Sequence, residues 1–206
     1  MYADWYVVSL HKVFGPHMGI LCGRRSTTQD LLDCSGYPLQ TGTLNYEACA
    51  GVGGLGRYWN ELANFQRRKP DDSVLTMSLR ELTSEGVRTA YGKIRQLEAK
   101  LLLCLMEGLE RSSKVHMVRP LHKDPSDRLP IVAFHHTSIP SDQIVDHCFA
   151  NGVVCRSGTF LSTPQFLEAA GGQQQPFVRL SMVHYNSLDD IHRTLQVLEK
   201  LPGWTL

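Results

Sequence analysis

The sequence lacks a charge excess, a long apolar run and a recognisable leader. Its 206 residues include 21 Lys and Arg against 20 Asp and Glu, a formal net charge of +1. This balance predicts no bulk attraction to nucleic acid or to an anionic membrane. No apolar stretch approaches the length of a transmembrane helix, so we expect no membrane span. Residues 1–5 carry no basic segment ahead of the short apolar run that follows, unlike a secretory signal peptide.

Cysteine is present, but not in a pattern that holds a metal or a disulfide framework. No C-x-x-C spacing occurs among the six cysteines. Most of them lie in apolar stretches, which indicates reduced, mostly buried thiols of a cytoplasmic protein. We therefore expect no metal site and no disulfide framework from Cys22, Cys34, Cys49, Cys104, Cys148 and Cys155.

The chain is long enough for one large domain or two small ones, since 42% of its residues are apolar. Residues 1–75 are glycine-rich and read as strand, turn and helix. A polar loop at 41–45 leads into a helix, and we interpret the glycines between 51 and 56 as points of close backbone approach. Residues 76–112 are expected to form a connecting helix between this part and a small domain at 113–206.

The connecting helix is predicted from one apolar stripe and one charged face. The stripe recurs every three or four residues at Val87, Ala90, Ile94, Leu97, Leu101, Leu105 and Leu109. The face assigned to solvent carries Arg88, Lys93, Arg95, Glu98 and Lys100.

The last part alternates strands and helices in the order β-β-α-β-β-α, which predicts a compact α+β layer. The strands are expected at 115–118, 130–136, 153–156 and 177–183. One helix is expected at 141–149, and a last helix is expected to follow the capping sequence at 187–190.

The residues that could carry chemistry come first in the chain. An apolar strand at 5–8 leads directly into Ser9, His11 and Lys12, and the tight turn Gly15-Pro16 follows. A lysine held at the end of a strand, beside a hydroxyl and an imidazole, suits an amine that forms a Schiff base with a carbonyl cofactor. A solvated lysine in a hairpin loop is the alternative.

Four motifs in a fixed order make the first reading more specific. Residues 9–16 match S-x-H-K-x-x-G-P, and residues 42–45 match G-T-P-N except that leucine replaces proline. Residues 156–158 match R-x-G, and residues 179–187 match R-x-S-x-x-x-Y-N-T except that serine ends the run. With these motifs the chain resembles the C-terminal portion of a class V aminotransferase, in the pyridoxal-phosphate family that includes the cysteine desulfurases.

The resemblance implies an α/β fold, the fold type I of pyridoxal-phosphate (PLP) dependent transferases, of which aspartate aminotransferase is typical. Residues 1–75 would then be the C-terminal part of the large cofactor-binding domain, and residues 113–206 the α+β small domain. The cofactor implied is pyridoxal 5'-phosphate, and the substrate implied is a small amino acid.

The resemblance also assigns the cofactor residues by position. Lys12 would hold the cofactor as a Schiff base and later move the substrate α-proton. Ser9 and His11 would donate hydrogen bonds to the cofactor phosphate. Thr43 would reach the phosphate of the neighbouring subunit's cofactor, which implies a homodimer with composite sites.

Two arginines would serve the substrate. Arg179 would bind its α-carboxylate through a bidentate pair, and Arg156 would lie at the entrance of the site. Family desulfurases carry R-x-G-x-x-C, whose cysteine takes up sulfur as a persulfide, whereas this chain has Leu161 at that place. Leucine cannot accept sulfur, so aminotransferase, lyase and epimerase chemistry stay open instead.

A second departure concerns what precedes the lysine. The family places a phosphate-binding turn, a ring-stacking side chain and an aspartate for the pyridine nitrogen upstream of it. Asp4 is too near Lys12 to be that aspartate and matches a later D-[FW]-Y pattern. We therefore expect an incomplete chain of such an enzyme. The alternatives are an inactive truncated paralogue that keeps the fold and the dimer surface, and an unrelated α/β binding module.

Overall fold

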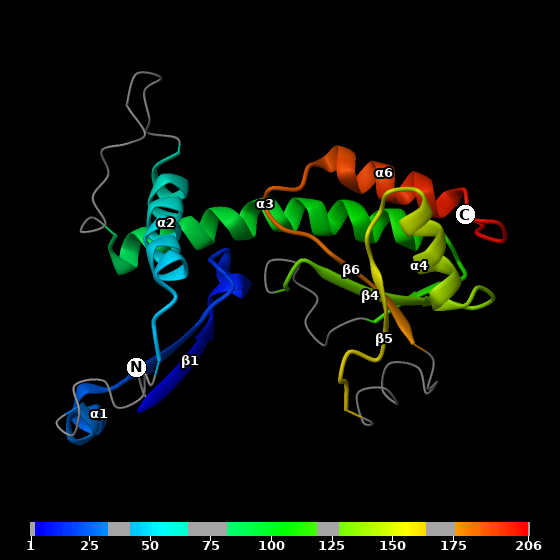
Figure 1. The fold of residues 1–206 in the computed structure, drawn as a ribbon. Helices are drawn as coiled ribbons and strands as arrows, with labels where there is room; N and C mark the ends of the chain where they lie inside the picture. Colours follow the sequence, from blue (N-terminus) through cyan, green and yellow to red (C-terminus); the bar gives the residue numbers. More distant parts are fainter. Residues whose placement is uncertain (1–2, 33–41, 66–81, 119–127, 164–175, 206) are drawn as a thin grey trace. The chain divides into compact units, whose positions relative to one another are not determined.

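The computed structural model describes residues 3–32, 42–65, 82–118, 128–163 and 176–205 (Figure 1). The chain divides into two compact units, Met1–Tyr91 and Gly92–Leu206. The division falls inside a long helix, α3 (Ser84–Glu110), and each unit has a sheet of its own. The domain boundaries expected after residues 75 and 112 refer to the domains of a PLP-dependent enzyme, and they stay predictions.

The first unit is built on a β-hairpin followed by helices. β1 (Trp5–Ser9) pairs antiparallel with β2 (Gly19–Gly23) along its full length. A 3-10 turn, η1 (Leu10–Val13), leads away from β1, and α1 (Arg25–Leu32) and α2 (Tyr46–Asn64) follow β2. Aromatic and β-branched residues fill β1, and these residue types favour an extended backbone. Ser9 and Gly19 are the last paired residues of the hairpin, so its loop begins directly after Ser9.

The hairpin loop is anchored on α2 by one buried leucine. Leu10 is 4% exposed and Leu55 of α2 is 5% exposed. A Cβ atom at Gly15 would lie 3.0 Å from Leu55 Cδ2 and 3.1 Å from the Leu10 carbonyl oxygen, so only glycine fits there without a shift. The Leu10 N–H donates to the Met18 carbonyl and the Gly15 N–H to the Leu10 carbonyl, both at 2.8 Å. The loop that carries Lys12 is thus closed by its own backbone.

α2 begins at Tyr46, directly after the polar loop, as predicted. The side chain of Asn45 accepts the Ala48 N–H at 3.0 Å and so caps the helix. The helix continues through the glycine-rich segment instead of breaking there. A Cβ atom at Gly51 would meet the Pro16 side chain at 3.4 Å, an ordinary van der Waals contact, so this position does not require glycine for space. At Gly54 a Cβ atom would meet nothing within 4 Å, so there the interpretation was wrong.

The second unit has the predicted β-β-α-β-β-α order. Its elements are β3 (Val115–Met117), β4 (Ile131–His136), α4 (Ser141–Ala150), β5 (Arg156–Gly158), β6 (Phe177–Ser181) and α6 (Leu188–Glu199). The later part of α3 also belongs to this unit. The four strands form an antiparallel sheet with the spatial order β3-β4-β6-β5. β5 begins at the last residue of the strand expected at 153–156, so that expectation was three residues too early.

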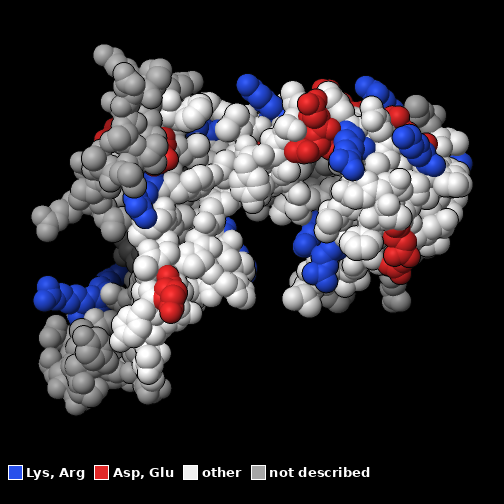
Figure 2. Space-filling model, turned by 45° about the horizontal axis from the view of Figure 1, so that its top comes forward, with Lys and Arg blue, Asp and Glu red and all other residues white. Residues whose placement is uncertain are grey.

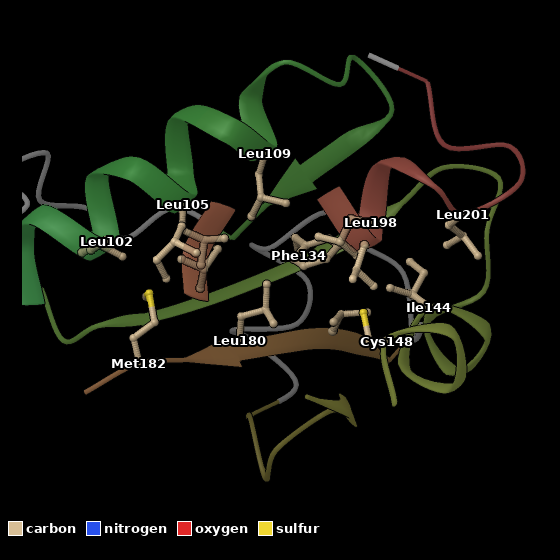
Figure 3. Packing of buried hydrophobic residues seen from close by; sticks show 14 of the residues in the cluster. Leu102, Leu105, Leu109, Phe134, Ile144, Cys148, Leu180, Met182, Leu198 and Leu201 are labelled. Atoms are coloured by element: carbon tan, nitrogen blue, oxygen red, sulfur yellow. The ribbon is translucent and has the colours of Figure 1, made fainter. Parts of the chain in front are cut away.

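The core of this unit lies on one face of the sheet. Alternate strand residues point inward, including Val132 and Phe134 of β4 and Val178 and Leu180 of β6, all at most 5% exposed. Figure 3 shows how side chains from α3, α4 and α6 meet these strand residues. α3, α4 and α6 thus cover one face of the sheet, and the strand residues between the buried ones point from the other face.

The apolar stripe of α3 differs from the prediction at two neighbouring positions. Leu97 is 43% exposed, whereas Leu102, which was not assigned to the stripe, is 1% exposed. Glu98 was assigned to the solvent face, yet its side chain is only 15% exposed. At 3.6 residues per turn, position 98 lies four residues after Ile94 and seven before Leu105, which is the middle of the buried face.

The cysteines are free but less buried than expected. Of those in the described ranges, only Cys148 is buried, Cys22 is exposed, and the others are half-buried; Cys34 lies outside these ranges. The hydrogen bond between the thiols of Cys148 and Cys155, together with burial, raises the pKa of Cys148, and the same bond lowers the pKa of Cys155. Cys155 is therefore a packed thiol.

Charge is mixed over the surface. Figure 2 shows basic and acidic side chains interspersed on the visible face of the molecule. No helix among the described residues is long and apolar enough to cross a membrane. Within those residues we also find no group of three or more His, Cys, Asp or Glu that could hold a metal ion.

Candidate functional site

The residues predicted to bind the cofactor meet at the end of β1. Ser9 is the last residue of the strand, and His11 and Lys12 lie in η1 directly after it. The Ser9 hydroxyl and His11 Nδ1 are hydrogen-bonded at 2.9 Å. Lys12 is exposed, while Leu10 between these residues is buried. A buried anchor thus holds a hydroxyl, an imidazole and a primary amine within four residues.

The imidazole of His17 lies against that of His11, a contact that was not predicted from the sequence. The rings of His11 and His17 are 4.6 Å apart, centroid to centroid. The pairing of Ser9 with Gly19 brings the start and the end of the loop together. A hairpin register written out from the strands at 5–9 and 19–23 would have placed His17 near His11. Besides Lys12, the end of β1 and the loop therefore offer three polar side chains, Ser9, His11 and His17, rather than the two that were predicted.

Thr43 lies in the same unit but outside this loop. It is exposed, two residues before the α2 cap at Asn45. No hydrogen bond found among the described residues joins it to Ser9, His11 or Lys12. A role in a neighbouring subunit's site stays a prediction.

The two arginines predicted to serve the substrate meet in the second unit. Arg156 of β5 and Arg179 of β6 are direct partners in the antiparallel register. The Arg179 guanidinium carbon lies 4.3 Å from the centre of the Phe160 ring, a cation–π contact that the sequence did not reveal. Arg179 is half-buried and Arg156 is exposed. Both alternate with inward-facing residues, so both belong to the sheet face that is not covered by the helices.

The turn after β5 has an unusual backbone. Phe160 and Leu161 both have positive φ angles, 53° and 60°, which L residues rarely adopt. Leu161 is 100% exposed. The position that carries a sulfur-accepting cysteine in desulfurases thus presents a bare leucine side chain to solvent.

The end of the last motif has a structural role. Asn186 Oδ1 accepts the Val183 N–H at 3.0 Å, and Ser187 caps α6 in a reciprocal capping box with Asp190. The backbone N–H and the hydroxyl of Ser187 and the Asn186 amide hold the pKa of Asp190 below its usual value. The asparagine and the serine of the motif therefore position the β6–α6 connection.

Other features of the second unit lie away from the predicted residues. A shallow pocket near the start of α6 is lined in part by Asn186, Asp190 and Arg193, and it includes neither Arg156 nor Arg179. In the first unit, Asp4 lies 3.6 Å from Arg24, so this carboxylate already has a cationic partner. Ser9, His11 and Lys12 belong to one unit and the two arginines to the other.

The chain is similar to known proteins in sequence and in fold. No family model matches the chain. A curated aminotransferase-like protein of Gibberella zeae is 25% identical over 204 residues, which cover 96% of this chain and 46% of that protein. The chain spans about half the length of the relatives it matches.

Solved structures match over nearly the whole chain. A cysteine desulfurase of Thermococcus onnurineus has a TM-score of 0.67 at 20% identity, covering 97% of this chain and 47% of that one. The cysteine desulfurase CsdA of Escherichia coli has a TM-score of 0.60 at 19% identity, covering 96% of this chain and 46% of that one. The chain therefore has the fold of the C-terminal half of these enzymes, a part of the α/β fold of PLP-dependent transferases, as the sequence predicted.

Proposed function

We propose that this chain carries the lysine-bearing part of a PLP-dependent enzyme of the class V aminotransferase, cysteine desulfurase-like type. The observation that carries the proposal is the loop after β1, where Ser9, His11 and Lys12 occupy one turn fixed by the buried Leu10. A solvated lysine in an unanchored loop would need neither the glycine contact at residue 15 nor the leucine anchor. This favours a lysine held for chemistry.

The residues present fit two of the three functional ends of the cofactor. The exposed amine of Lys12 is accessible to an aldehyde, and the Ser9 hydroxyl with the imidazoles of His11 and His17 can donate hydrogen bonds to a phosphate. The ring nitrogen needs a carboxylate, and Asp4 is engaged by Arg24. When bound, the cofactor would supply an electron sink for a substrate carbanion.

Each of these side chains would then have a defined role. Ser9, His11 and His17 would bind and orient the phosphate, and the loop backbone would keep the Lys12 amine beside them. Lys12 would serve as covalent anchor and as the base that moves the substrate α-proton. Arg179, held against Phe160, would orient an amino-acid substrate through its α-carboxylate.

The reaction class is narrowed by Leu161. A leucine side chain has no nucleophile, so transamination, elimination or epimerisation of an amino acid fits this chain better than sulfur transfer through a persulfide. Thr43 and the family pattern support a homodimer in which each subunit completes the partner's phosphate site. The alternative is a catalytically inactive, truncated relative that keeps the fold and the dimer surface.

Borohydride trapping tests the proposal. The 206-residue chain is incubated with pyridoxal phosphate, reduced, and digested for peptide mass mapping. We expect the label to concentrate on Lys12, to vanish in Lys12→Ala and to persist in Lys100→Ala, which removes an exposed lysine of α3. Labelling spread evenly over the exposed lysines would overturn the proposed function and favour the inactive alternative.

A further inference from the structure

Two positive charges face each other across the β5–β6 pair. Arg156 and Arg179 are opposite residues in the register, and opposite residues of antiparallel strands project from the same face with Cα atoms about 4.5 to 5.5 Å apart. Like charges in this position destabilise a sheet. The pair therefore has a cost that an arrangement serving the fold alone would avoid.

Within the described part of the chain, neither guanidinium has an acidic partner that would relieve this repulsion. Among the described residues, no carboxylate forms an ion pair with either guanidinium. Asp142 of α4 accepts the hydroxyl of Ser157, the β5 residue next to Arg156. Ser157 pairs with the buried Val178, so this contact lies on the helix-covered face of the sheet.

The next row of the same face adds donors rather than acids. His116 of β3 and His135 of β4 are register partners, and their rings stack with centroids 5.2 Å apart. Ala133, the β4 partner of Arg179, has only a methyl side chain. The open face of the sheet thus joins two arginines and two imidazoles around a small residue.

We propose that this face recognises an amino acid with two acidic groups: Arg179 binds the α-carboxylate and Arg156 binds a second carboxylate on the substrate side chain. The inference rests on the proposed function and names its substrate class as an acidic amino acid. The Arg179 guanidinium is in cation–π contact with Phe160, and a guanidinium can bind one carboxylate through a bidentate pair. The exposed Arg156 would pair with the second carboxylate. One ligand with two carboxylates would thus supply a counter-charge to each arginine and relieve their repulsion.

The test follows the guanidinium Nε signals of the 206-residue chain, labelled with ¹⁵N-arginine, as L-glutamate or L-glutamine is added. The variants Arg156→Gln and Arg179→Gln assign the two signals. We expect glutamate to bind at least roughly tenfold more tightly than glutamine, which corresponds to about 1.4 kcal/mol for one added charge pair. Arg156→Gln should abolish this preference and keep glutamine binding, and Arg179→Gln should weaken both.

Arg111→Gln is the matched control, because Arg111 is exposed beyond the end of α3 and its change removes the same charge. It should leave the glutamate preference intact. Equal affinity for the two amino acids, no shift with either, or a preference that survives Arg156→Gln overturns the inference. If Lys12 is labelled specifically but glutamate is not preferred, the substrate class alone fails. A glutamate preference with evenly labelled lysines overturns the proposed function, and the substrate role with it.

Discussion

Glu98 of α3 joins the β6–α6 connection to the core through His184. Its carboxylate accepts the His184 backbone N–H, and Glu98 Oε1 lies 3.7 Å from His184 Nδ1. Burial raises the pKa of Glu98, and the backbone hydrogen bond offsets only part of that rise. Burial also lowers the pKa of His184. Both groups are therefore held toward their neutral forms, which makes this a hydrogen-bonded link rather than a strong ion pair.

The first prediction is that Glu98→Gln does not destabilise the chain at pH 7. An acid whose folded pKa is raised adds stability below its unfolded pKa of 4.5, and that contribution is lost as pH rises through the folded value. The amide keeps the acceptor for the His184 N–H without a buried charge. Urea unfolding should show an unchanged or higher free energy at pH 7 and a flatter dependence between pH 4.5 and 7.

Glu107→Gln serves as control for this first prediction, since Glu107 is exposed on the same helix. It should change neither the free energy of unfolding nor its pH dependence. A loss of more than about 2 kcal/mol in Glu98→Gln at pH 7 would mean instead that a charged pair with His184 holds the connection.

The second prediction concerns acid sensitivity. Burial lowers the pKa of His135, His136 and His184, with further lowering of His136 by Lys114, His116 and His135 and of His135 by His116. A depressed folded pKa contributes stability that is present above the unfolded value of 6.5 and lost as pH falls through the folded value. Thermal unfolding midpoints should therefore decline as pH drops below about 6.5.

His136→Asn isolates one share of this acid effect. His136 Nδ1 accepts the N–H groups of Ser138 and Ile139, at 3.2 and 3.1 Å, and an asparagine oxygen can accept similar bonds without titrating. The variant should show a shallower decline between pH 7.5 and 5.5. His192→Asn, an exposed position on α6, should retain the full decline. Identical pH profiles for all three proteins would contradict the assignment.

The third prediction tests the backbone of the turn after β5. Leu161 has a φ of 60° and a fully exposed side chain, so nothing it contacts offsets its left-handed conformation. Leu161→Gly should raise the free energy of unfolding by up to about 1 kcal/mol, less the extra entropy that glycine gives the unfolded chain. Leu103→Gly, at a half-exposed position inside α3, should lower it by about 1 kcal/mol. A loss at Leu161 would mean that its side chain stabilises the turn.

Much of the secondary structure could be predicted from local sequence patterns. Asn45 and Ser187 predicted helix starts because a cap depends on a side chain and the next three backbone N–H groups. The order of strands and helices along the second unit was also predicted, whereas the spatial strand order β3-β4-β6-β5 and the helix-covered face were not. Spacings of three and four residues alone do not fix the angular position of a residue on a helix. For this reason Leu97, which is exposed, was predicted to be buried, and Glu98, which is largely buried, was predicted to face solvent.

The candidate site was partly predictable for the same reason. Ser9, His11 and Lys12 are neighbours in sequence, so a motif found them together. His17 depends on the hairpin register, and Phe160 depends on a turn whose left-handed residues are neither glycine nor asparagine. The partnership of Arg156 with Arg179 needed the pairing of two strands that lie about twenty residues apart. Contacts of this kind arise from tertiary pairing, which residue spacing alone does not encode.

The fourth prediction links packing to the lysine loop through two glycines. Gly15→Ala would place a Cβ atom 3.0 Å from Leu55 Cδ2 and 3.1 Å from a backbone carbonyl, so the loop must shift away from α2. We expect lower stability of the first unit and weaker borohydride labelling of Lys12. Gly54→Ala, where a Cβ atom meets nothing within 4 Å, should instead stabilise α2 by about 1 kcal/mol and leave labelling unchanged. If both variants label like the unmodified chain, the position of the loop on α2 does not control the reactivity of Lys12.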